Sequence, residues 1–133
     1  MNLFDYRRRE TGEVQIGGKP LGGNHPIRVQ SMTNTSTMDT EACVAQTLRI
    51  AEAGGDYVRL TTQGVREAEN LRNINAGVRA AGCAVPLVAD VHFNPKVADV
   101  AALYAEKVRI NPGNYVDAAR TFKHLEYLSL IHI

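Results

Sequence analysis

Apolar and polar positions alternate in four short stretches of the chain, and a longer pattern separates each stretch from the next. The four stretches are residues 26–32, 56–62, 86–93 and 107–111, and each contains the β-branched residues that are typical of strands. Between them, apolar residues recur every three or four positions, as in amphipathic helices. The pattern therefore predicts four consecutive βα units.

Capping residues set the limits of the predicted helices. Asp39 is the expected N-cap of the first helix, which the glycines at 54–55 end. The second helix spans 64–82, and Asn-Pro at 94–95 is expected to begin the third. Their apolar stripes consist of Val44, Leu48 and Ala51; of Val65, Ala68, Leu71, Ile74, Val78 and Ala81; and of Val97, Val100, Ala101 and Tyr104. A fourth helix is expected from about Tyr115, with Asn114 as its cap.

Upstream of these units, residues 13–23 (EVQIGGKPLGG) predict a small β-hairpin. The glycine spacing fits neither the dinucleotide-binding nor the Walker pattern, and no helix follows directly, so we interpret these glycines as turn residues. Residues 1–26 are therefore assigned to an N-terminal extension and hairpin. The run of three arginines at 7–9 is interpreted as a solvated charge run.

The alternation of strands and helices implies a parallel sheet covered by helices. Two α/β architectures have this order: an open, doubly wound sheet and the (β/α)8 TIM-type barrel. A full barrel takes about 250 residues, whereas this chain has 133. The sequence thus predicts either a small open sheet or the N-terminal half, about four βα units, of a TIM-type barrel.

Polar side chains occupy one face of each predicted strand near its carboxyl end, where α/β folds build their active sites. The candidate site residues are Gln30, Arg59, Asp90, His92, Arg109 and Asn111. Arg59 and Arg109 suit a multiply charged anion, because a guanidinium group binds phosphate oxygens through paired donors and stays charged. The sequence therefore predicts a phosphorylated substrate.

Each of these positions also has a structural interpretation, since an arginine can pair with an aspartate and a histidine can lie hydrogen-bonded in a core. The same placement on four strands favours a site. Asp90 and His92 are the candidate catalytic acid–base pair. The same two residues also suit two other roles: they can orient the arginines, or they can bind substrate hydroxyls.

Composition and charge exclude several classes of function. The formal net charge of +1 gives no strong field for nucleic acid or an anionic membrane. No apolar run approaches the roughly 20 residues of a membrane helix, and the N-terminus lacks the apolar centre of a signal peptide. Cys43 and Cys83 form no C-x-x-C pair, which favours free thiols and a cytoplasmic location. No His or Cys residues stand at metal-ligand spacing, so no metal site is expected.

Four blocks of the sequence resemble signature blocks of the 4-hydroxy-3-methylbut-2-enyl diphosphate synthase family, the iron–sulfur enzymes of the methylerythritol phosphate route to isoprenoids. The blocks are VQSMTNT (29–35), VRLTTQG (58–64), PLVADVHFNP (86–95) and KVRINPGN (107–114). The first 35 residues and NYVDAARTFKHLEY (114–127) resemble the long form of the family from Bacteroides-type bacteria, chlamydiae and plants. The resemblance runs from Met1 to Tyr127, and its blocks are long, ordered and correctly spaced.

The resemblance implies that residues 27–127 are the first half of a TIM barrel that binds 2-C-methyl-D-erythritol 2,4-cyclodiphosphate. The full-length enzyme would reduce this substrate to 4-hydroxy-3-methylbut-2-enyl diphosphate. It also implies a separate C-terminal domain with a 4Fe-4S cluster on three cysteines and a glutamate. Ferredoxin or flavodoxin would supply two electrons, and the full-length enzyme would be a homodimer. Arg59 and Arg109 match the diphosphate-binding arginines of the family. Gln30, Asp90, His92 and Asn111 match polar positions of the same pocket.

The sequence also departs from the family. It holds four of eight βα units, and we interpret the apolar residues 128–133 (LSLIHI) as a sequence artefact. Cys43 and Cys83 match no cluster ligand and are interpreted as buried structural thiols. The chain alone is expected to be inactive and to self-associate. Two other functions stay open: another phosphate-binding barrel, of the pterin-binding or aldolase-like kind, and a non-catalytic αβ module that binds an anion.

Overall fold

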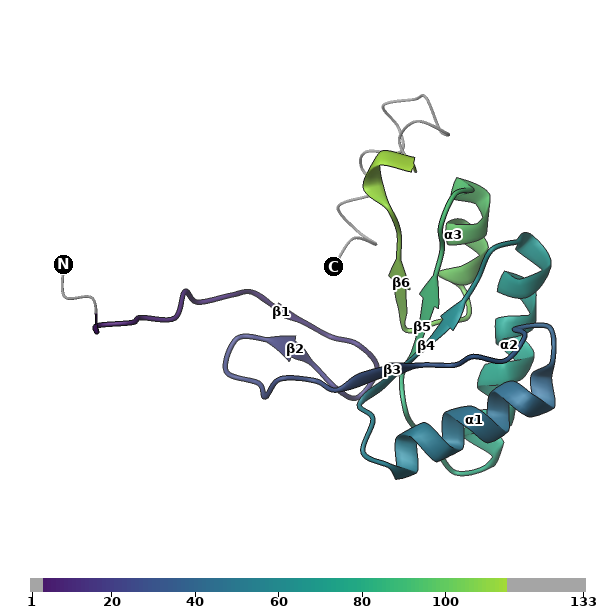
Figure 1. Cartoon of the computed structure of the whole chain (residues 1–133), viewed down its shortest axis with the longest axis horizontal. Helices are drawn as coiled ribbons and strands as arrows, with labels where there is room; N and C mark the ends of the chain where they lie inside the picture. The colour runs from purple at the N-terminus through teal and green to yellow at the C-terminus, as the bar shows by residue number, and fades with distance from the viewer. Residues whose placement is uncertain (1–3, 115–133) are drawn as a thin grey trace.

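The structure is a computed structural model, which describes residues 4–114 (Figure 1). A two-stranded antiparallel hairpin precedes a four-stranded parallel sheet whose strands lie in the order β3-β4-β5-β6. The elements in chain order are β1 (Glu13–Val14), β2 (Leu21–Gly22), β3 (Gln30–Met32), α1 (Thr40–Glu52), β4 (Tyr57–Thr61), α2 (Val65–Ala80), β5 (Leu87–Asp90), α3 (Pro95–Ala101) and β6 (Lys107–Arg109).

The three helices cover one face of the sheet, and the hairpin lies on the other (Figure 1). Neighbouring strands are consecutive in the chain and parallel, so the winding never reverses direction. A doubly wound sheet reverses its strand order and places helices on both faces, whereas a (β/α) barrel keeps all helices outside. The described residues therefore have the winding of a TIM-type barrel rather than of an open doubly wound sheet.

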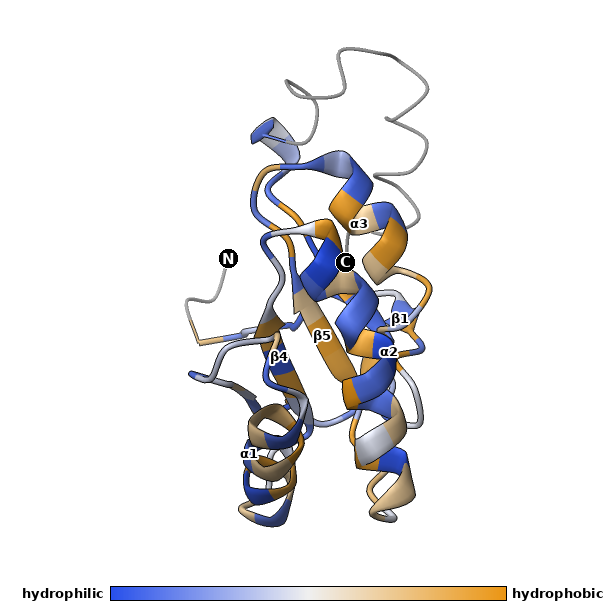
Figure 2. Cartoon of the chain, turned by 90° about the vertical axis from the view of Figure 1, so that its right-hand side faces the viewer, coloured by the Kyte–Doolittle hydropathy of each residue, from blue (hydrophilic) through white to orange (hydrophobic). Residues whose placement is uncertain are grey.

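The main core lies between the sheet and the helices. Val58, Leu60 and Val108 face the helices from alternate strand positions and are buried, as the period-two pattern predicts. The predicted stripe of α2 is confirmed at its four central positions, which are fully buried: Ala68, Leu71, Ile74 and Val78. Figure 2 shows the apolar colouring of β5 between β4 and α2.

The hairpin closes the amino-terminal end of the opposite face. Ile16, in the hairpin loop, is fully buried against Tyr57 and Val88. The Tyr57 hydroxyl donates a hydrogen bond to the carbonyl oxygen of Lys19, and the Lys19 ammonium pairs with Asp56 at 3.0 Å. These contacts fix the hairpin to the first residues of β4. The hairpin that the sequence predicts therefore packs against the sheet.

The predicted strands and helices are present within the described residues, but several are shorter than the pattern suggests. β3 begins at Gln30 rather than at residue 26, because the backbone N–H of Val29 bonds to the Asp56 carboxylate at 2.8 Å instead of to a strand. α3 ends at Ala101, and Tyr104 follows in a turn. No helix among residues 4–114 is long and apolar enough to cross a membrane.

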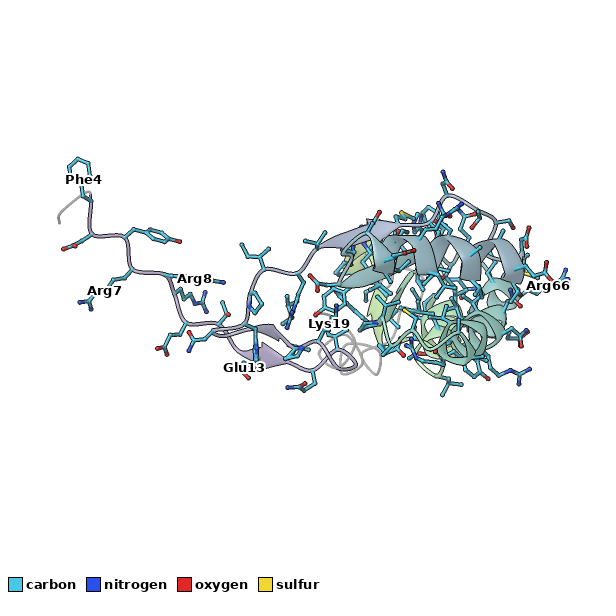
Figure 3. All side chains as sticks on the ribbon, turned by 90° about the horizontal axis from the view of Figure 1, so that it is seen from below. Phe4, Arg7, Arg8, Glu13, Lys19 and Arg66 are labelled. Atoms are coloured by element: carbon cyan, nitrogen blue, oxygen red, sulfur yellow. The ribbon has the colours of Figure 1, made fainter. Side chains whose placement is uncertain are left out.

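Residues 4–12, which precede β1, extend away from the sheet and helices (Figure 3). Phe4, Arg7 and Arg8 lie along this arm, and residues 7–9 are all exposed. This exposure agrees with the interpretation of the arginine run as a solvated charge run.

Candidate anion-binding site

Strand register brings charged side chains together on the face of the sheet away from the helices. Thr61 of β4 lies opposite Asp90 of β5, which lies opposite Arg109 of β6. Arg59 precedes Thr61 by two residues, so its side chain points to the same face. The register therefore assembles the three residues at the carboxyl ends of neighbouring parallel strands.

The Asp90 carboxylate bridges the two arginines. Its side chain is 1% exposed, and Oδ2 accepts hydrogen bonds from both Nε (2.9 Å) and Nη2 of Arg59. Its other oxygen, Oδ1, accepts a hydrogen bond from Nη1 of Arg109 at 3.0 Å. Both carboxylate oxygens are thus used to hold guanidinium groups in fixed positions.

Both arginines keep N–H donors that Asp90 does not use. A guanidinium carries five N–H groups, of which the bonds to Asp90 use two in Arg59 and one in Arg109. Within residues 4–114, the remaining groups have no hydrogen-bond acceptor, and the side chains are 30% and 46% exposed. Two permanent cations share one carboxylate, so the cluster has a net positive charge and accessible donors for an anion.

Asp90 is held in its ionised form. Burial alone would raise its pKa, but the hydrogen bonds from Arg59, the close approach of His92 and the charges of Arg59 and Arg109 outweigh burial and leave the pKa below its ordinary value. A carboxylate that is stabilised in this way is a weak base. The geometry therefore favours an orienting role for Asp90.

His92 lies beside this carboxylate. Its Nε2 atom is 3.2 Å from Asp90 Oδ2, within ion-pair distance, although the angles do not make a well-formed hydrogen bond, and the atom itself is buried. The Phe93 ring packs edge-on against the imidazole at 5.9 Å between centroids. Of the predicted acid–base pair, His92 is therefore the residue that keeps a ring nitrogen without a hydrogen-bond partner among residues 4–114.

Asn111 has a structural role that the sequence analysis did not assign. Its side-chain oxygen accepts a hydrogen bond from Gly113 N at 3.1 Å, and residues 112–114 are helical. Asn94 caps α3 in the same way, with Lys96 N at 3.0 Å. The repeated Asn-Pro pair explains both caps, because asparagine accepts the first N–H bond and proline fits the first helical turn.

The prediction that Asn114 caps the next helix is therefore wrong, because Asn111 already does so. Asn114 instead donates its side-chain N–H to the carbonyl oxygen of His92 at 3.3 Å. It thereby ties the end of β6 to the end of β5. The helix expected from about Tyr115 lies outside the described residues.

Gln30 lies lower on the sheet than predicted. It is the first residue of β3 and pairs with Tyr57, whereas Arg59 lies opposite Met32. Gln30 therefore lies two residues nearer the amino ends of the strands than Arg59, because the register with β4 sets its level. Its side chain remains on the same face as Arg59 but nearer the hairpin.

Lys107 belongs to the same face and was missed by the sequence analysis. It precedes Arg109 by two residues, and this spacing alone was the signal that could have identified it. Its ammonium lies 6.0 Å from the centroid of the Tyr57 ring. Burial and, less strongly, the charge of Arg59 lower its pKa. Lys107 is therefore a partly buried cation next to the arginine pair.

The two cysteines do not fit an iron–sulfur cluster. Cys43 is a buried residue of α1, where its Sγ donates to the carbonyl oxygen of Ser36 at 3.2 Å and burial raises its pKa. Cys83 follows α2 and is partly exposed, so the prediction that both thiols are buried is wrong for Cys83. Within residues 4–114, no group of three His, Cys, Asp or Glu side chains could hold a metal ion.

The singly wound parallel sheet places the chain in the class of TIM-type barrel domains. Comparison with known families is more specific. Residues 11–129 match the family described as the GcpE TIM-barrel domain, and the chain belongs to that family.

The chain is similar to longer curated proteins called 4-hydroxy-3-methylbut-2-en-1-yl diphosphate synthase (flavodoxin). Over 127 residues it is 80% identical to the protein from Bacteroides thetaiotaomicron and 77% identical to that from Bacteroides fragilis. These matches cover 96% of this chain but 21% and 20% of the relatives. The chain thus spans about a fifth of their length.

Among solved structures, dihydropteroate synthase from Xanthomonas albilineans has a similar fold. Its complex with 7,8-dihydropteroate superposes with a TM-score of 0.61 and 25% sequence identity, over 92% of this chain and 47% of that one. The similarity supports the barrel winding that the strand order shows.

Proposed function

We propose that this chain is the substrate-binding part of a reductive synthase that converts 2-C-methyl-D-erythritol 2,4-cyclodiphosphate to 4-hydroxy-3-methylbut-2-enyl diphosphate. The observation that carries the proposal is the Arg59–Asp90–Arg109 cluster at the carboxyl ends of β4, β5 and β6. Identity of 80% to a relative with that name supports it. The diphosphate would bind the N–H groups of Arg59 and Arg109 that Asp90 leaves available.

The arrangement suits a diphosphate because the arginines are oriented before it arrives. Asp90 fixes both guanidinium groups, so less side-chain entropy is lost when an anion binds. His92, at the edge of the same cluster, would donate a proton to an oxygen of the opening ring. Asn111 would act indirectly: its side chain caps the helical turn that follows β6 and so holds that backbone in place.

The electron donor and the location of the enzyme follow from the same proposal. The relatives' name specifies flavodoxin, and we propose flavodoxin as the donor to a 4Fe-4S cluster in the C-terminal domain that the family resemblance implies. Because Cys43 and Cys83 are both free, we propose that the protein acts in the cytoplasm.

A pterin-binding barrel is the second candidate, because dihydropteroate synthase shares the fold. Isothermal titration calorimetry of the 133-residue chain with the cyclodiphosphate, with a dihydropterin and with inorganic phosphate separates the candidates. We expect the cyclodiphosphate to bind most tightly, and Arg59→Ala to weaken it by about tenfold or more. Preference for the pterin, or equal binding of all three ligands, would contradict the proposed substrate.

A further inference from the structure

We propose that Lys107 is a third cationic ligand of the anion site and binds the second phosphate group of a diphosphate. The inference rests on the proposed function, because it extends that anion site to a further residue of β6. It identifies the residue that would distinguish a diphosphate from a single phosphate.

Register places Lys107 beside the arginine pair. Lys107 lies opposite Val88, which lies opposite Arg59, so Lys107 and Arg59 stand at the same level of the sheet with β5 between them. Adjacent strands lie about 4.8 Å apart, so the two Cα atoms are about 10 Å apart. Both side chains point to the face away from the helices, and one elongated anion can contact both.

The charge balance of this face leaves Lys107 without a counter-ion. Three cations lie on this face, those of Arg59, Lys107 and Arg109, and both Asp90 oxygens are taken by the arginines. Within residues 4–114, Lys107 makes no ion pair. Lys19, near the hairpin, shows the contrast, because its ammonium pairs with Asp56 at 3.0 Å.

A partly buried ammonium without a carboxylate is electrostatically unfavourable. The lowered pKa of Lys107 reflects its burial and then the charge of Arg59. A bound phosphate would relieve both effects, because it would supply negative charge and hydrogen-bond acceptors. The free energy of that relief would contribute to binding.

Tyr57 contacts the Lys107 side chain on this face of the sheet. The ring lies 6.0 Å below the ammonium, at the outer limit of a cation–π contact. The ring itself is fixed by Ile16 and by the hydrogen bond to Lys19 O. A weak contact of this kind orients the side chain while leaving three N–H donors for phosphate oxygens.

The test is a calorimetric titration of the full chain with inorganic pyrophosphate and with inorganic phosphate at constant ionic strength. We expect Lys107→Met to weaken pyrophosphate binding by about ten- to a hundredfold, while phosphate binding changes by less than about threefold. Lys107→Arg should restore most of the pyrophosphate affinity, because it keeps the charge. Lys96→Met is the matched control, since Lys96 is exposed on α3 and should leave both affinities unchanged.

Circular dichroism and thermal unfolding establish that each variant is folded, and Lys107→Gln replaces Lys107→Met if the latter is not. If wild-type protein binds pyrophosphate and Arg109→Ala abolishes binding, but neither neutral Lys107 variant changes it, the role of Lys107 is overturned and the proposed anion site stands. If the wild-type chain binds neither anion, the proposed function and this inference fail together.

Discussion

Asp90 is the residue on which the candidate site depends, because one buried carboxylate positions two arginines from two other strands. Removing one partner of a buried ionic cluster leaves the others without compensation, which is costly. Asp90 therefore links stability to function. Its substitution should disturb both the fold and the orientation of the guanidinium groups.

The lowered pKa of Asp90 predicts an acid-sensitive fold. A carboxyl whose folded-state pKa is depressed stabilises the protein above its unfolded-state pKa, about 3.9, and this contribution is lost as pH falls through the folded-state value. We expect the free energy of unfolding, measured by urea denaturation, to fall as pH is lowered from about 5 to 3.

The variant Asp90→Asn isolates this contribution. It should lower the free energy of unfolding at pH 7 by about 1–3 kcal/mol and flatten the acid dependence. Asp99→Asn, at an exposed position of α3, is the matched control and should leave the pH profile unchanged. An Asp90→Asn protein with the same acid dependence as wild type would show that Asp90 is not the responsible group.

At the residue scale, alternation alone predicted that Arg59, Asp90 and Arg109 share a face, and the structure brings all three into contact. The level of each residue along its strand could not be predicted in the same way. Gln30 lies lower than expected and Lys107 was missed, because level depends on strand register, which tertiary hydrogen bonds set.

The segment just before β6 carries a second polar network, at the end of the sheet away from the site. Glu106 accepts hydrogen bonds from Leu87 N at 2.7 Å and from Arg79 Nη2 at 2.8 Å. Asn75 donates to the same carboxylate and to the Tyr104 carbonyl. The network joins α2, β5 and the chain before β6, and in barrels this amino end serves stability.

Glu106→Ala should therefore destabilise the protein without affecting the anion site. The loss leaves the Leu87 N–H and the Arg79 guanidinium without their acceptor, and we expect the free energy of unfolding to fall by about 1–3 kcal/mol. Urea denaturation measures this change. Pyrophosphate affinity, measured where the variant is folded, should match wild type, and a large drop would contradict the separation of the two ends.

At the element scale, the order and type of the elements could be predicted because local signals agree: period-two strands, capped helices and glycine C-caps. Asp39 accepts from Ala42 N at 3.1 Å, as expected of an N-cap. The ends of the elements were less predictable where a side chain from a distant segment bonds to a backbone group that a strand would otherwise use. Asp56 limits β3 in this way: its carboxylate accepts the hydrogen bond of the Val29 N–H, and the strand begins at the next residue, Gln30.

The whole sheet has two strands, β3 and β6, that each pair on one side only within the described residues. Large apolar side chains near β3 are exposed: Ile27 is 86% and Val29 59% exposed. Unpaired edges with exposed apolar side chains are sites of strand addition. The 133-residue chain in isolation is therefore expected to self-associate.

Val29→Lys should reduce this self-association, because a charge beside an edge strand opposes pairing with another chain. Sedimentation velocity over a range of concentrations measures the effect. Leu103→Lys is the matched control, since Leu103 is an exposed apolar residue after α3, away from β3. A single monomeric boundary for the wild-type chain at high concentration would disprove the expectation.

At the scale of the molecule, the sequence left an open sheet and a barrel as alternatives. Both have the same βα order, and they differ in the face on which each helix packs. That choice depends on the crossover geometry, and here the core cluster joins residues of α1, α2 and α3 to one face of the sheet. The packing of the hairpin on the other face, through Ile16, could not be predicted from the local sequence pattern either.

The most direct test of the central claim is the affinity of the 133-residue chain for 2-C-methyl-D-erythritol 2,4-cyclodiphosphate in two arginine variants. Arg109→Met removes a guanidinium bound to Asp90, whereas Arg66→Met removes an exposed one at the start of α2 (Figure 3). By isothermal titration calorimetry, we expect Arg109→Met to weaken binding by about ten- to a hundredfold and Arg66→Met to leave it unchanged. Equal affinity in both variants would contradict the assignment of the diphosphate site.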